Sequence, residues 1–262
     1  MQHAQSRLLA RKWIGRGALA SLAALIAAVV LPALPALAGS WSAPVQLPGS
    51  CGSSVAENQA GAMAAGGTFQ AADGSTHVQL CTSPDGKTWQ AADLGQGGSL
   101  RRPVMAVDPS GRAAAVWGSY VGCPAACGYI AQAAVHPAGG SWGAPVTLST
   151  YLQFDRGGPV LGVDGAGNAL AVFGSSFSWH LTGGGWGAAT SLPAGSSGGL
   201  AVADPAGTFV YADSSGNAFT FAAGAVGFGT GSGSRGSLDD LKIVPGRAVM
   251  LAAGAVSAET VT

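Results

Sequence analysis

The stretch Val104-Met-Ala-Val-Asp108-Pro-Ser-Gly111-Arg-Ala-Ala-Ala-Val-Trp117 decides the fold, because its pattern returns as Val160-Leu-Gly-Val-Asp164-Gly-Ala-Gly167-Asn-Ala-Leu-Ala-Val-Phe173. Each copy joins two apolar runs through a polar turn with Gly, which is typical of two antiparallel strands and a short loop. A third copy is Leu200-Ala-Val-Ala-Asp204-Pro-Ala-Gly207-Thr-Phe-Val-Tyr211, and weaker copies cover residues 62–72 and 241–251. A two-strand unit therefore recurs along the chain.

A second motif alternates with the first and consists of a Trp, several small residues and an apolar end. Its copies are Trp41-Ser-Ala-Pro-Val-Gln-Leu47, Trp89-Gln-Ala-Ala-Asp-Leu94, Trp142-Gly-Ala-Pro-Val-Thr-Leu148 and Trp186-Gly-Ala-Ala-Thr-Ser-Leu192. The Trp residues lie 48, 53 and 44 residues apart, a period typical of stacked supersecondary units. Together the motifs predict units of four short antiparallel strands, in which the Trp-led segment is the fourth.

One four-stranded sheet cannot bury both of its faces, whereas several sheets arranged around an axis bury them against one another. We therefore predict an all-β fold, a five-bladed β-propeller of four-stranded antiparallel blades over residues 39–262. The segment 41–47 is expected to complete the last blade, whose other strands are predicted at 241–244, 247–251 and 256–261, so that the ring closes without an exposed edge. A pair of β-sandwich domains is the alternative.

The composition agrees with a packed all-β protein. Of the 262 residues, 43 are Gly and 14 are Pro, which is too many helix breakers for a helical bundle. Hydrophobic residues make up 48 % of the chain and charged residues 9 %, and this balance excludes disorder driven by excess charge.

Residues 1–38 have the pattern of a signal peptide. A basic start is followed by an apolar stretch over residues 18–38, which ends in Ala36-Leu37-Ala38, a small-x-small site for signal peptidase. We expect cleavage after Ala38 and export of residues 39–262 as a secreted or cell-surface domain without a membrane span; an uncleaved anchor is the alternative. The exported part carries 8 basic and 12 acidic residues, a net charge of −4, which argues against nucleic acid as a partner.

All four Cys residues lie in the exported part, where an even number is typical of disulfides. They are Cys51, Cys81, Cys123 and Cys127. Proximity in sequence favours the pairs Cys51–Cys81 and Cys123–Cys127 among the three possible pairings, and a four-Cys zinc site is the alternative. The four His residues are scattered without zinc-type spacing, so we predict neither a metal site nor a cofactor.

The segment Ser83-Pro-Asp85-Gly86-Lys-Thr-Trp89 resembles the Asp-box of sialidase-like β-propellers of the secreted bacterial type. That motif is written Ser-x-Asp-x-Gly-x-Thr-Trp, and this chain has one residue fewer between Asp and Gly. The resemblance implies a structural turn between the third and fourth strands of a blade, in which Ser83 and Asp85 cap the turn and Trp89 packs in the blade.

The same family would imply a sialidase-like or other glycoside hydrolase, which needs three Arg around a carboxylate, a Tyr nucleophile with a Glu, and an Asp acid/base. Arg102, Arg156 and Arg235 each precede a first strand and could meet in one funnel. The exported part contains only Glu57 and Glu259, and neither has a Tyr nearby in sequence. We therefore expect a binding or scaffold module, with a hydrolase and a purely structural cell-surface protein as alternatives.

Three loops that depart from the repeat form the candidate ligand site. They cover residues 120–129, 150–156 and 230–240, and the phase of the repeat places them on one rim of the predicted propeller. We expect a glycan or another small polar ligand there, because aromatic faces and polar groups suit sugars. The candidate residues are Arg102, Tyr120, Tyr151, Asp155, Arg156, Arg235, Asp239 and Asp240. By contrast, the Asp residues that recur with the repeat, Asp108, Asp164 and Asp204, are expected to cap turns.

Overall fold

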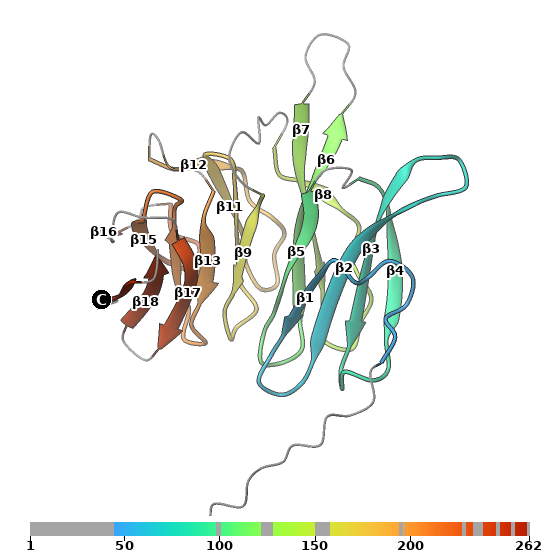
Figure 1. The fold of residues 1–262 in the computed structure, drawn as a ribbon, viewed down its shortest axis with the longest axis horizontal. Helices are drawn as coiled ribbons and strands as arrows, with labels where there is room; N and C mark the ends of the chain where they lie inside the picture. The colour runs from blue at the N-terminus through green and yellow to red at the C-terminus, as the bar shows by residue number, and fades with distance from the viewer. Residues whose placement is uncertain are drawn as a thin grey trace, which may run out of the picture. The chain divides into compact units, whose positions relative to one another are not determined.

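The computed structural model describes residues 45–97, 101–121, 128–149, 158–193, 196, 198–226, 229–232, 238–244, 247–252 and 255–260. These residues form five antiparallel sheets that follow one another along the chain (Figure 1). Among the residues described, none forms a helix of the length and apolar character needed to cross a membrane. The prediction of an all-β fold is confirmed for this part of the chain.

Four of the sheets are four-stranded and pair in sequence order. The first contains β1 (Ser54–Glu57), β2 (Met63–Gln70), β3 (Thr76–Ser83) and β4 (Gln90–Gln96). The second contains β5 (Arg101–Val107), β6 (Ala113–Val121), β7 (Gly128–His136) and β8 (Val146–Thr147). The third contains β9 (Val160–Val163), β10 (Ala169–Phe173), β11 (Ser176–His180) and β12 (Thr190–Ser191). The fourth contains β13 (Leu200–Ala203), β14 (Thr208–Ala212), β15 (Asn217–Ala222) and β16 (Gly229–Ser232).

The fifth sheet has three described strands, β17 (Leu238–Val244), β18 (Arg247–Ala252) and β19 (Ala255–Thr260), as the sequence predicts. The segment predicted to complete it is described only at residues 45–47, and these form no strand. Leu47 packs instead against Cys51 and Ala65 of the first sheet. Pairing of residues 41–44 with the fifth sheet lies outside the described residues, and closure of the ring stays a prediction.

The duplicated motif forms the first two strands of a sheet and their turn, as predicted. The Trp-led segments at Trp89, Trp142 and Trp186 lead into fourth strands, but two of these strands are shorter than expected. β8 and β12 contain two residues each, and both begin four residues after the Trp. In the second sheet, Pro145 lies directly before β8 and cannot donate a ladder hydrogen bond.

The turn between the first and second strands has the same construction in the first four sheets. Its first residue, an Asn or Asp, accepts hydrogen bonds of 2.8–2.9 Å from amides further along the turn. These residues are Asn58, Asp108, Asp164 and Asp204. The Gly three residues later has a φ of 84° to 100°, which side chains other than Gly rarely adopt. The prediction that the recurring Asp residues cap turns is therefore confirmed, and Asn58 is a further member.

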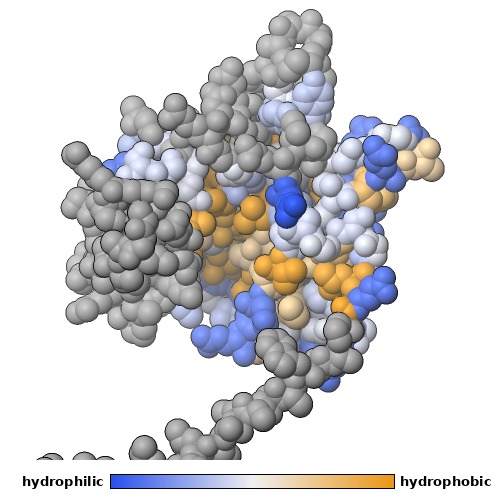
Figure 2. Space-filling model, in the orientation of Figure 1, coloured by the Kyte–Doolittle hydropathy of each residue, from blue (hydrophilic) through white to orange (hydrophobic). Residues whose placement is uncertain are grey.

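Neighbouring sheets bury their apolar faces against each other. Between the first and second sheets, Leu80 packs with Trp117. Between the second and third, Val116 packs with Phe173, and aromatic side chains of the third and fourth sheets form the next layer. Trp142 and Trp186 also lie against these layers. Figure 2 shows apolar residues gathered over β5 and β9, the first strands of their sheets.

A disulfide joins Cys51 to Cys81, with 6.0 Å between their Cα atoms, and this predicted pair is confirmed. It fastens the segment before β1 to the third strand of the first sheet. Both residues are fully buried beside Ala65. The second predicted pair, Cys123 with Cys127, lies outside the described residues. A disulfide fits an oxidising, extracytoplasmic environment.

Candidate functional site

The predicted ligand rim is described in part. Arg102 and Tyr120 lie within the described residues, and both are exposed. Of the remaining candidates, some lie outside the described part of the chain, and others are described by their backbone alone. They are Tyr151, Asp155, Arg156 and Arg235, and the side chains of Asp239 and Asp240 in β17. The predicted convergence of three Arg residues is therefore untested.

Tyr120 forms an aromatic pair on the β6–β7 hairpin, which extends beyond the neighbouring strands in Figure 1. It lies opposite Tyr129 in the ladder, and the two ring centroids are 5.6 Å apart with a tilt of 58°. Tyr120 is 44 % exposed. The hairpin reaches past β5, since Arg101 pairs with Gly118, two residues before Tyr120.

Buried polar groups support the base of this hairpin. The amide oxygen of Gln132 accepts hydrogen bonds from the indole of Trp117 and the hydroxyl of Ser119. Trp117 is fully buried and Ser119 nearly so. On the adjacent strand β5, the guanidinium of Arg102 donates to the carbonyl of Ser53 at 3.4 Å. The aromatic pair thus stands on a rigid base with polar groups next to it.

The segment that resembles an Asp-box lies between β3 and β4, the position that the resemblance implies. One carboxylate oxygen of Asp85 accepts from the amides of Lys87 and Thr88 at 2.9 and 2.8 Å, and from the Ser83 hydroxyl at 3.1 Å. These bonds, led by the Thr88 amide, lower the pKa of Asp85. The Trp89 indole donates to the carbonyl of Gly86. All of these groups serve the turn itself.

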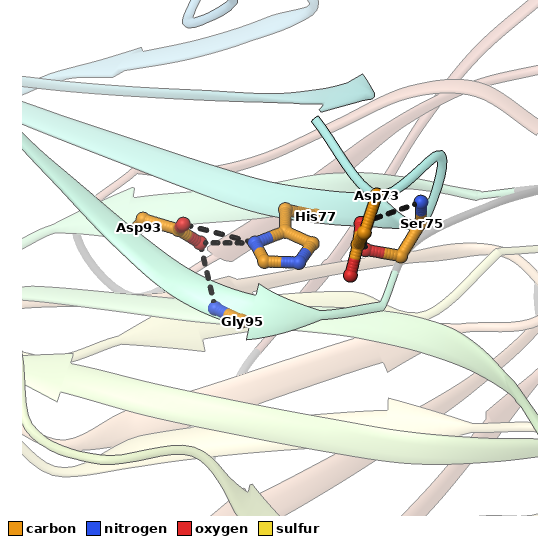
Figure 3. A network of polar contacts seen from close by, with 5 residues as sticks. All are labelled: Asp73, Ser75, His77, Asp93 and Gly95. Carbon is orange, nitrogen blue, oxygen red and sulfur yellow. Dashed lines mark hydrogen bonds and ion pairs between the residues drawn. The ribbon is translucent and has the colours of Figure 1, made fainter. Parts of the chain in front are cut away.

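A second polar cluster lies at the edge formed by the β2–β3 turn and β4 (Figure 3). The ring nitrogen Nδ1 of His77 is 2.9 Å from the carboxylate of Asp93. Burial raises the pKa of Asp93, but the Gly95 amide and His77 lower it further, so that the net shift is downward. Asp73 binds the hydroxyl and amide of Ser75, which lowers its pKa. The cluster braces two strands at an exposed edge.

A cavity of about 270 Å³ lies between the turns at the other end of the strands of the first two sheets. Turns of both sheets line it, and Met63 is half-buried at its wall. Its polar lining includes Asn58, Ser83, Ser110 and His136. This cavity was not predicted from the sequence, because regular turns of the repeat form it, whereas the predicted ligand rim consists of loops that break the repeat.

His136 belongs to a repeated His–Trp pair. It ends β7, and its ring centroid is 5.4 Å from that of Trp142, six residues later; His180 and Trp186 repeat this at 5.5 Å. Nε2 of His136 lies 3.2 Å from the Thr82 hydroxyl oxygen of the first sheet. Burial lowers the pKa of both imidazoles. The common spacing of six residues is the signal in the sequence for this pair.

Acid is expected to destabilise the protein below about pH 6.5. Because burial lowers the pKa of His136 and His180, the unfolded chain binds more protons than the folded chain below the ordinary His value near 6.5. The melting temperature should therefore be constant from pH 8 to 7 and should fall from pH 6.5 to 5, where the carboxylates stay ionised. A His136→Gln, His180→Gln variant should show a smaller fall, and an equal fall would contradict this origin.

Comparisons with known proteins add distant similarities. No protein-family model matches the sequence, and no curated protein matches it significantly. Among solved structures, YCF48 bound to D1 peptide has 16 % identity and a TM-score of 0.44 over 79 % of this chain and 62 % of that chain. A protein of unknown function from Bacteroides thetaiotaomicron has 12 % identity and a TM-score of 0.39 over 78 % and 56 %, respectively.

A gluconolactonase from Xanthomonas campestris has 14 % identity and a TM-score of 0.38 over 72 % of this chain and 69 % of that chain. This chain therefore spans less than two thirds of the length of the first two structures. With TM-scores below 0.5, these similarities assign neither a fold nor an activity. The architecture rests on the sheets described above.

Proposed function

We propose that the protein is a secreted five-bladed β-propeller that acts as a binding module, with a glycan as its ligand. Consecutive four-stranded meanders that bury their faces against one another are the construction of propeller blades. The disulfide and the signal-peptide pattern of residues 1–38 support export.

The pair of exposed Tyr120 and half-buried Tyr129 is the observation that carries the binding role. Aromatic rings present flat apolar faces together with hydroxyl groups, and sugars offer complementary C–H faces and hydroxyls. The pair lies on the β6–β7 hairpin, at the same end of the second sheet as Arg102, the second residue of β5. The predicted loops at 150–156 and 230–240 would extend this surface around the rim.

Screening the purified protein against a panel of neutral and sialylated glycans tests this proposal. Tyr120→Ala is expected to weaken the best binder about tenfold, corresponding to the loss of roughly 1.4 kcal/mol of aromatic contact. Val226→Ala is the control, because Val226 is 76 % exposed in the connection between β15 and β16, in a different sheet from the hairpin. A panel without binders, or equal affinities for the two variants, would contradict the proposal.

Aryl glycosides, including an aryl sialoside, separate binding from hydrolysis in the same preparation. A binding module should leave them intact while it retains a glycan. Release of the aryl group, abolished by substitution of Arg102, would favour the alternative of a sialidase-like hydrolase.

A further inference from the structure

We propose that the cavity between the first and second sheets is a binding site for a guanidinium group, carried by a small molecule or by an Arg side chain of a partner. This site is separate from the aromatic pair, because the two lie at opposite ends of the strands of the second sheet. The chain itself supplies the argument, since the equivalent space between the second and third sheets holds a guanidinium of its own. We call the two spaces the first and second crevice.

The two crevices are built from equivalent residues. Each is formed by the Asx turn of one sheet together with the Asx turn of the next sheet and the turn between that sheet's third and fourth strands. The turn between β3 and β4 of the first sheet also lines the first crevice. Counting from the turn caps, Ala62 in the first crevice corresponds to Arg112 in the second, since each lies four residues after its cap. Counting from the paired His residues, Ala138 corresponds to Thr182. Both Ala residues line the cavity.

In the second crevice, Arg112 and Thr182 converge on a single carbonyl. The guanidinium of Arg112 donates to the carbonyl oxygen of Ala166 at 2.6 Å, and the hydroxyl of Thr182 donates to the same oxygen. The guanidinium also lies over the turn at Gly167. The second crevice is thus filled by a hydrogen-bond donor with a positive charge.

In the first crevice, neither of these two donors is present, and the hydrogen bond that crosses it runs from the side-chain amide of Asn58 to the carbonyl of Asp108 at 2.7 Å. Ser110 takes the position of Ala166, two residues after the turn cap, and it lines the cavity. The two turns have the same hydrogen bonds between their cap and their backbone amides. The Ser110 carbonyl of the first crevice is therefore the equivalent of the Ala166 carbonyl, to which Arg112 donates in the second crevice. Ala62 and Ala138 leave the space of the two longer side chains open. The cavity is therefore shaped for a donor such as a guanidinium.

The charge around the first crevice favours a cation. No carboxylate lines the cavity itself, but the elements around it carry Glu57 and Asp85 against the single ammonium of Lys87. Asp108 is buried, and its carboxylate lies beside Gly167 of the second crevice. Arg112 lies on the same turn as Asp108, but its guanidinium is engaged in the second crevice. Burial lowers the pKa of His136 in the cavity wall, so that this ring is neutral near pH 7. Carboxylates in excess attract a cation even in partly exposed sites.

Titration with N-propylguanidinium, followed by amide NMR, tests the site. The isosteric neutral compound N-propylurea shows whether charge matters, and Gly-Arg-Gly and Gly-Lys-Gly peptides show whether an Arg side chain on a peptide is accepted. We expect the amides of Ala62, Ser110 and Ala138 to shift with N-propylguanidinium and with the Arg peptide, and at least tenfold weaker effects with the urea and the Lys peptide. Binding of the small compound without the Arg peptide would restrict the ligand to a free small molecule.

Ala62→Arg should fill the first crevice as Arg112 fills the second, and should weaken binding of N-propylguanidinium at least tenfold. Val226→Arg is the matched control, because it adds the same charge at an exposed position between β15 and β16. A complementary variant, Arg112→Ala, should open a second site, so that N-propylguanidinium then also shifts the amide of Gly167. Equal binding by the urea, unchanged binding by Ala62→Arg, or shifts away from the crevices would overturn the proposal.

Discussion

Replacement of Gly67 by Ala is expected to destabilise the protein by about 3 kcal/mol, a large loss for a single added methyl group. A Cβ atom on Gly67 would stand 1.7 Å from the carbonyl oxygen of Ser50 and 3.2 Å from the hydroxyl of Ser53. Because the first contact is with backbone, no side-chain rotation relieves it. Either β2 or the segment before β1 would have to move.

Neither segment is free to move. The Ser50 amide donates to the side-chain oxygen of Gln79 on β3 at 2.7 Å, and the Ser53 amide donates to the carbonyl of Gly66 at 3.0 Å. The disulfide holds Cys51 between these two bonds. The segment before β1 is thus fixed on both sides of the carbonyl that the new Cβ would meet. The clash must therefore lower the free energy of unfolding.

Urea denaturation measures this loss as a lower midpoint at unchanged slope. Gly52→Ala is the matched control, because it adds the same methyl group to the same segment where no atom lies within 4 Å. Its free energy of unfolding should stay within about 0.5 kcal/mol of the parent. Equal midpoints for the Gly67 variant and the parent would show that the segment before β1 does not pack on β2.

Removal of the Cys51–Cys81 disulfide is the second change with a large expected effect. Its residues are 30 apart in sequence, and a loop of this length corresponds to about 3.5 kcal/mol in the chain-entropy account. We expect the Cys51→Ala, Cys81→Ala variant to lose about this much stability. Ala is preferred to Ser because both positions are fully buried and a hydroxyl there would need a partner.

A reducing agent separates the cross-link from the packing of the sulfur atoms. Reduction should lower the melting temperature of the parent toward that of the double variant and should leave the variant unchanged. A parent that melts equally with and without reductant, with its thiols shown to be free, would mean that the hydrogen bonds of Ser50 and Ser53 hold the segment without the disulfide.

The turns and strand order were predictable because their chemistry is local. A carboxylate or amide that accepts from amides two and four residues ahead needs only neighbouring residues, and so Asp108, Asp164 and Asp204 could be assigned from their spacing to Gly. The disulfide was predictable for a similar reason, since Cys81 is the nearest Cys to Cys51 in sequence.

The predicted ligand rim consists of loops that break the repeat, so no repeated pattern fixes their conformation. Of its candidate residues, the structure describes the side chains of Arg102 and Tyr120. The partner of Tyr120 in the ladder, Tyr129, follows from strand register, which the sequence pattern leaves open where both faces carry mixed side chains.

The sequence by itself determined the repeated strand pairs, the capped turns and the link between Cys51 and Cys81, because each depends on residues that are close along the chain or unique in type. Only the tertiary structure decided that a filled crevice and an open crevice lie on either side of the second sheet. Arg112 and Ala62 occupy the same place in their turns, and the difference between them matters only where a neighbouring sheet brings the carbonyl of Ala166 or Ser110 within reach. Contacts of this kind depend on how sheets pack, which no short stretch of sequence contains.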